Sequence, residues 1–116
     1  MIRSVFAGFM YLVSLSAFSC SNALPTDSPY FCSSFKTVAT CYCTATGLPS
    51  GMCQSMPSLY SRMLSYFGSL KAACMYQQDQ LHYSSAQDCI DNWNCYLNGG
   101  VDSKGRLCSA TKLACQ

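Results

Sequence analysis

The sequence predicts a small all-α domain, a bundle of three to four helices that disulfide bonds staple together. Apolar residues recur along it at the three- and four-residue spacing of amphipathic helices. Ten of its 116 residues are cysteine, a density typical of exported domains whose core is too small to hold the fold alone. A chain of this length has room for one such domain.

The first 23 residues are expected to be a secretory signal peptide, which leaves residues 24–116 as a single cysteine-rich helical domain. Arg3 provides the basic start of such a peptide, and an apolar run follows from Val5 to Phe18. That run is shorter than the roughly 20 apolar residues that span a membrane. No later segment is long and apolar enough to do so, and we therefore expect no transmembrane segment after signal removal.

Cys20 lies between the two cleavage sites that the sequence offers. Cleavage after Ala23, where Ser21 and Ala23 form a small-x-small pattern, discards Cys20 and leaves nine cysteines. Cleavage after Ser19 keeps all ten. We favour the first, because the local pattern is direct whereas an even cysteine count is only a tendency. Lipidation of Cys20 is a third alternative, although Phe18 stands where a lipoprotein signal has a small residue.

The first helix is expected from Tyr30 to about Ala45. Asp27 or Ser28 can cap its start, and Gly47 ends it. Its apolar stripe consists of Phe31, Phe35, Val38 and Tyr42.

Residues 47–57 are expected to form a turn or a single helical turn. Pro57 then begins a second helix, which we expect to be the longest and to continue past Gly68, at a cost of about 1 kcal/mol. Its stripe consists of Tyr60, Met63, Phe67, Leu70 and Cys74.

A third helix should follow a polar link at residues 77–83. Ser84 or Ser85 caps it, with Asp88 placed to complete a capping box, and it ends at Asn98. Its buried face consists of Ala86, Cys89, Ile90, Trp93 and Leu97. After a turn at residues 98–106, a short C-terminal helix is expected over residues 107–116.

Two disulfides are predicted between the third helix and this C-terminal helix. Cys89 with Cys115 and Cys95 with Cys108 have nearly the same sum of residue numbers. Facing positions of an antiparallel hairpin share this property, and the two pairs would therefore form successive rungs.

The remaining cysteines are expected to form a second group of bridges. Cys32 with Cys74 would bracket the turn around Gly51. Cys41 and Cys43 should not bond to each other, because a two-residue helical spacing points their side chains apart. Four cysteines would then pair among themselves: Cys20, Cys41, Cys43 and Cys53. If Cys20 is cleaved off, one of the other three is left over as a free thiol or an intermolecular link.

The sequence contains no recognisable catalytic constellation, and we expect a protein that is not an enzyme and carries no cofactor. His82 is the only histidine, and it has no nucleophile and acid at a plausible spacing. Asp88 and Asp91 fit the positive end of a helix dipole rather than a catalytic pair. No pair of cysteines has the Cys-x-x-Cys spacing of zinc sites, and no metal site is expected. The absence of a basic stripe argues against nucleic acid as a partner.

The low charge of the chain favours contact with another protein. Charged residues make up 10% of the sequence, against roughly 25% in an average domain, and Tyr, Ser, Gln and Asn are common. Charged residues are depleted and aromatic residues enriched at the centres of protein interfaces. The interface candidates are Tyr60, Tyr66, Tyr76 and Trp93, although for Trp93 a role as the anchor of the core is favoured.

These observations predict an exported interaction protein that docks on a larger cell-envelope or extracellular assembly, for example a surface or secretion-machine complex. The periplasm, the cell envelope and the external medium are all compatible locations. A freely secreted effector, toxin-like or signalling protein is an alternative with the same scaffold. A lipoprotein anchored through Cys20 is a second alternative, and an enzyme with a reactive thiol requires an unpaired cysteine.

Overall fold

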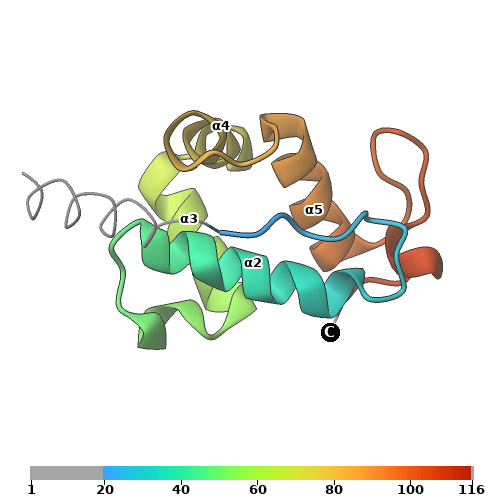
Figure 1. Ribbon diagram of the computed structural model, residues 1–116, viewed down its shortest axis with the longest axis horizontal. Helices are drawn as coiled ribbons and strands as arrows, with labels where there is room; N and C mark the ends of the chain where they lie inside the picture. Colours follow the sequence, from blue (N-terminus) through green and yellow to red (C-terminus); the bar gives the residue numbers. More distant parts are fainter. Residues whose placement is uncertain (1–19, 116) are drawn as a thin grey trace, which may run out of the picture.

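Four α-helices make up most of the described chain, residues 20–115 of the computed structural model. They are α2 (Phe31–Ala45), α3 (Met56–Phe67), α4 (Leu70–Leu81) and α5 (Ala86–Asn98), with 3₁₀ turns η2 (Ser50–Cys53) and η3 (Cys108–Ala110). In Figure 1, α2 crosses the front of the molecule, α3 lies behind it, and α4 and α5 lie above. Five disulfides join these elements, and the predicted all-α, disulfide-stapled bundle is confirmed.

The first helix, α2, begins and ends where its apolar stripe predicts. Its buried face consists of Phe31, Phe35, Val38, Ala39, Tyr42 and Cys43. The predicted cap is wrong, because Tyr30 occupies the N-cap position and makes no side-chain capping hydrogen bond. Ser28 instead accepts a hydrogen bond from the backbone N–H of Tyr30 and stabilises the turn before the helix.

The predicted long second helix is wrong, because the chain breaks at Gly68 into α3 and α4. Gly68 adopts a left-handed conformation with φ 90°, and its N–H bonds to the carbonyl of Leu64. Ser69 then caps α4 by accepting a hydrogen bond from the N–H of Ala72. A left-handed glycine followed by a serine cap ends one helix and starts the next within two residues. The polar segment expected to be a link is therefore helical as far as Leu81.

The third predicted helix is confirmed as α5, with Ser85 as its cap. The Oγ of Ser85 accepts a hydrogen bond from the N–H of Asp88. The expected C-terminal helix is reduced to the short turn η3, because Ser109, Ala110 and Lys112 all have positive φ values of 55–66°. An α-helix cannot continue through that conformation.

The core is built on aromatic side chains from three helices. The ring of Phe35 in α2 meets the indole of Trp93 in α5 edge to face, with centroids 4.9 Å apart. The ring of Tyr60 in α3 also packs against Trp93, with centroids 5.1 Å apart. Trp93 is only 2% exposed, which confirms its role as the anchor of the core.

Three of the five disulfides agree with the sequence-based expectations. Cys95 bonds to Cys108 as predicted. The group of four pairs internally, as Cys20–Cys41 and Cys43–Cys53.

The other two predicted bridges are wrong: Cys74 bonds to Cys89 and Cys32 bonds to Cys115. The break at Gly68 turns α4 back beside α5, and this places Cys74 opposite Cys89. The C-terminal segment does not form a helix along α5. It runs to the start of α2, where Cys115 meets Cys32.

Candidate functional site

An apolar cavity of about 590 Å³ lies between α2, α3 and α4, with Trp93 of α5 also in its wall. Cavities of roughly 300–1,000 Å³ are typical of small-molecule sites. Its buried lining consists of Phe35, Ala39, Tyr42, Cys43, Leu59, Met63, Gln77, Tyr83 and Trp93. Its mouth consists of more accessible residues, namely Thr46, Leu48, Arg62, Ser65, Tyr66, Phe67 and Tyr76. Arg62 is the only charged residue in either set.

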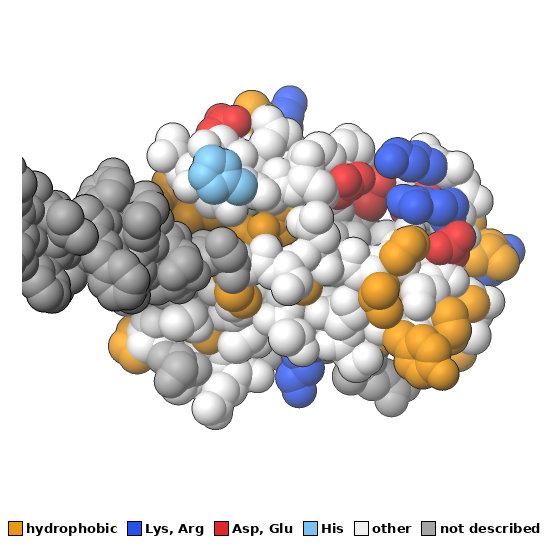
Figure 2. Space-filling view, in the orientation of Figure 1, with side chains coloured by type: hydrophobic (Ala, Val, Ile, Leu, Met, Phe, Trp, Pro, Cys, Tyr) orange, Lys and Arg blue, Asp and Glu red, His pale blue; other side chains and the backbone are white. Residues whose placement is uncertain are grey.

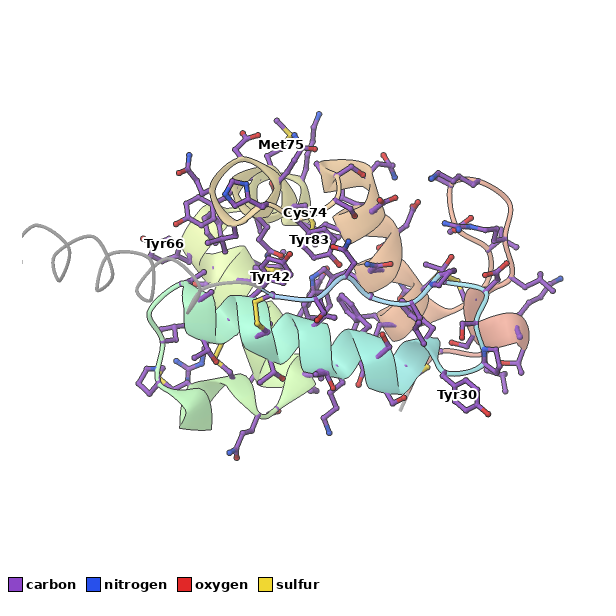
Figure 3. The ribbon with its side chains drawn as sticks, viewed as in Figure 1. Tyr30, Tyr42, Tyr66, Cys74, Met75 and Tyr83 are labelled. Carbon is purple, nitrogen blue, oxygen red and sulfur yellow. A yellow bond between two sulfur atoms is a disulfide. The ribbon has the colours of Figure 1, made fainter. Side chains whose placement is uncertain are left out.

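Tyr83 is directed into this cavity by the turn that ends α4. His82 adopts a left-handed conformation, and the N–H of Tyr83 then bonds back to the carbonyl of Gln77 at 3.0 Å. The ring of Tyr83 lies 4.8 Å from that of Tyr42, and Figure 3 shows the two side chains meeting between α2 and the α4–α5 pair. Two phenols from distant parts of the sequence therefore share one wall.

The phenol of Tyr83 stays neutral and keeps a proton to donate. Its side chain is buried, and burial raises its pKa well above the usual value. Asn92 donates a hydrogen bond from Nδ2 to the Tyr83 oxygen. The Tyr83 hydroxyl acts as the acceptor in that bond, so its own hydrogen remains available for another partner.

Gln77 brings a buried amide to the cavity without a strong partner for it. The residue is 8% exposed. Its Nε2 lies 3.5 Å from the Sδ of Met63, a weak acceptor. Its Oε1 lies 3.8 Å from the Sγ of Cys89, but that sulfur is bonded to Cys74 and carries no hydrogen to donate. Among the described residues, the Oε1 atom therefore receives no hydrogen bond.

The mouth of the cavity carries a cluster of aromatic residues, which we call the aromatic rim: Tyr66, Phe67 and Tyr76. Tyr66 and Phe67 meet edge to face at 4.8 Å, and Phe67 and Tyr76 lie 5.0 Å apart. Tyr66 is 84% exposed and Tyr76 is 38% exposed. Met75, 43% exposed, lies beside Tyr76 on α4.

Two of the four interface candidates are at the surface and two are not. Tyr66 and Tyr76 are exposed, as the sequence-based hypothesis requires. Trp93 is buried and Tyr60 is half-buried against it, because both complete the aromatic core. The burial of Trp93 agrees with its favoured role as the anchor of the core, and the interface role of the half-buried Tyr60 stays a prediction.

A second apolar surface, absent from the sequence-based predictions, lies at the opposite end of the molecule. Tyr30 is 71% exposed and Leu113 is 70% exposed. Figure 2 shows hydrophobic side chains gathered at that end, where Figure 3 places Tyr30. In the same view a group of charged side chains lies above it, a few others lie at the upper and lower edges, and most of the remaining face is uncharged.

The remaining chemical groups do not assemble around the cavity. His82 is exposed at the end of α4. Within residues 20–115, no group of three or more His, Cys, Asp or Glu residues is placed to hold a metal ion. None of the helices in this range is long and apolar enough to cross a membrane.

The bond between Cys20 and Cys41 bears on signal processing. The expected signal peptide lies outside the described residues as far as residue 19, whereas residues 20–23 are described. The sulfur of Cys20 is bonded to Cys41 and is not available for a lipid. Cleavage after Ala23 would remove Cys20 and free the thiol of Cys41, whereas cleavage after Ser19 preserves the bridge.

The Cys20–Cys41 bond favours cleavage after Ser19 over the cleavage after Ala23 that the local sequence pattern favours, and we therefore expect the mature protein to begin at Cys20 and to contain no free thiol. Intact mass spectrometry after alkylation should find no modified cysteine in the native protein and ten after reduction. A mature chain that begins at Leu24 with one alkylated cysteine would contradict this expectation.

The chain matches no protein-family model, no curated protein and no solved structure.

Proposed function

We propose that this chain is an exported, non-enzymatic interaction protein that docks on a larger cell-envelope or extracellular assembly. The five disulfides indicate an oxidising, extracytoplasmic environment. The observation that carries the proposal is the aromatic rim, which presents large aromatic side chains to solvent at one end of a rigid domain.

The aromatic rim has the features of a protein-binding surface. Tyrosine is enriched among the residues that dominate binding energy, because it offers a large contact area with few rotatable bonds. Tyr66 is already packed against Phe67, and Phe67 against Tyr76. This packing reduces the conformational entropy that Tyr66 would lose on binding.

The covalent framework supports this presentation. Cys74 lies on α4, one residue before Met75 and two before Tyr76, and its bond to Cys89 fixes α4 to α5. Tyr76 is therefore attached to a helix that cannot separate from α5, and Phe67 at the end of α3 packs against it. A preorganised surface of this kind binds with a smaller ordering cost than a flexible loop.

The experiment is site-specific photocrosslinking in the cells that produce the protein. A crosslinking amino acid at Tyr66 should yield one protein adduct of defined mass in the envelope or extracellular fraction. The matched control is the same amino acid at Tyr30, another highly exposed tyrosine at the opposite end of the molecule. Tyr30 should yield no such adduct.

Two results would count against docking. If neither position gave an adduct and the purified protein were a monodisperse monomer in the culture fluid, the freely secreted effector would be favoured. If Tyr30 gave the adduct and Tyr66 did not, the interface would lie at the end near Leu113, and the aromatic rim would lose its assigned role.

A further inference from the structure

We infer that the cavity between α2, α3 and α4 binds a small, uncharged, largely apolar molecule that carries one hydroxyl group. This activity goes beyond docking, since it concerns the interior of the domain and needs no protein partner. Three features carry the inference: the amide of Gln77, the phenol of Tyr83 and the distribution of charge along the cavity.

The Oε1 atom of Gln77 is an unpaired acceptor in an apolar wall, and the Nε2 atom has only the sulfur of Met63 as a partner. A buried acceptor without a donor costs stability, and proteins rarely retain one without a purpose. Leucine or methionine at this position would fill the same space without that cost. A hydroxyl group that enters the cavity can donate its proton to the Gln77 Oε1 atom and supply the missing hydrogen bond.

Tyr83 supplies the complementary half of the site. Its oxygen already accepts a hydrogen bond from Asn92, so its proton is free to reach a ligand oxygen. A hydroxyl group can donate to Gln77 and accept from Tyr83, whereas a carbonyl group can only accept. The pair of protein groups therefore favours an alcohol or a phenol.

The charge distribution favours a neutral molecule. No charged residue lies among the buried lining, and Arg62, the one charged residue of the cavity, is exposed at the mouth. An ion at the buried end would lose its hydration without a countercharge. The aromatic and aliphatic side chains of the buried lining, such as Met63, Leu59 and Phe35, fit an apolar body.

The test uses the purified mature protein and its own fluorescence. Trp93 is the single tryptophan of the chain and lines the cavity, so its emission reports on a ligand that enters. We expect a saturable change with 1-octanol and at least tenfold weaker binding of octanoate, the anionic counterpart of similar length.

A pair of variants isolates the role of the amide. Gln77→Met keeps the length of the side chain and removes the amide, and should weaken 1-octanol binding about tenfold without lowering the melting temperature. Gln80→Met, the same change at an exposed position of α4, should alter neither property. A merely structural Gln77 would show the opposite result, a lower melting temperature with unchanged affinity.

Three outcomes would overturn the inference. They are the absence of any saturable signal with 1-octanol, equal affinity in Gln77→Met and the wild type, and tighter binding of octanoate that is lost in Arg62→Gln. The last would indicate an acid held at the mouth.

If Gln77→Met did not fold, the ¹H–¹⁵N spectrum of the wild type would decide. The Gln77 side-chain amide signal must shift with 1-octanol while that of Gln80 stays in place. Because no partner is present, failure here leaves the crosslinking result unaffected.

Discussion

Replacing both Cys32 and Cys115 by serine should lower the free energy of unfolding by about 4 kcal/mol. This bridge closes the longest loop of the five, with a sequence separation of 83 residues. Three of the other bridges lie inside that loop and span 10, 15 and 13 residues. They shorten the effective loop to roughly 50 residues, for which the chain-entropy estimate remains about 4 kcal/mol.

The position of this bridge in the fold adds to the expected effect. The C-terminal segment contains only the short turn η3, and backbone hydrogen bonds hold it to the rest of the molecule. The N–H of Cys115 bonds to the carbonyl of Tyr96, and the N–H of Ser109 bonds to that of Thr26. Without the covalent link to α2, these bonds and the Cys95–Cys108 disulfide would be left to hold the segment in place.

The matched control is the double serine variant of Cys43 and Cys53. Its loop spans 10 residues, which corresponds to about 3 kcal/mol. Urea denaturation of both variants and the wild type gives the comparison. A loss in the Cys43/Cys53 variant equal to or larger than that in the Cys32/Cys115 variant would contradict the loop-length argument.

Local signals in the sequence predicted the helices, and the features that these signals missed depend on how the helices pack together. The stripe of α2 and the cap at Ser85 are short-range features that act in any context. The second helix was expected to continue past Gly68, because a glycine inside a helix usually lowers the stability of that helix by only about 1 kcal/mol. Here Ser69 follows it with a cap, and the two together end one helix and start another.

The wrong prediction for Cys74 follows from the missed helix break at Gly68. An unbroken second helix keeps Cys74 away from Cys89, whereas the turn at Gly68 brings the two cysteines together. The pairing of Cys32 with Cys115 depends on the path of the C-terminal segment, where non-glycine residues with positive φ replace the expected helix. Such residues carry no sequence signal of their own.

The buried end of the cavity could not be predicted from local pattern. Gln77 and Tyr83 lie in a segment so polar that it indicated an exposed link. The end of α4 instead turns Tyr83 inward beside Tyr42, a contact between residues 41 positions apart in the sequence. Residues 77–83 show no apolar periodicity, and the site becomes visible only when α2 and α4 are placed together.

Replacing Asp102 by asparagine should cost about 3 kcal/mol at neutral pH. Asp102 is 8% exposed and joins the N-terminal segment to the turn before η3. Its carboxylate accepts hydrogen bonds from the hydroxyl of Thr26 at 2.6 Å and from the Nε of Arg106 at 2.8 Å. The backbone N–H groups of Lys104 and Arg106 donate to its other oxygen, each at 2.9 Å. Asparagine would present an N–H group to some of these donors and leave the Arg106 charge without its partner.

The pH dependence gives this prediction a distinct signature. Burial alone would raise the pKa of Asp102, but the four hydrogen bonds outweigh it and lower the pKa from 3.8 to about 2. A carboxyl whose pKa is lower in the folded state stabilises the protein above its unfolded pKa, and the contribution disappears as the pH falls toward 2. The wild type should therefore lose about 2 kcal/mol of stability between pH 5 and pH 2 through this group.

The difference in the free energy of unfolding between the wild type and Asp102→Asn should shrink over that same pH range. Protonation removes the charge of Asp102 in the wild type, and the variant lacks that charge at every pH. Urea denaturation at a series of pH values measures it. Asp27→Asn is the control, since Asp27 is exposed next to Thr26 and none of the hydrogen bonds found involves its side chain. It should leave the pH profile unchanged. A constant difference between the wild type and Asp102→Asn from pH 5 to pH 2 would show that the ionised carboxylate is not what joins the N-terminal segment to the C-terminal turn.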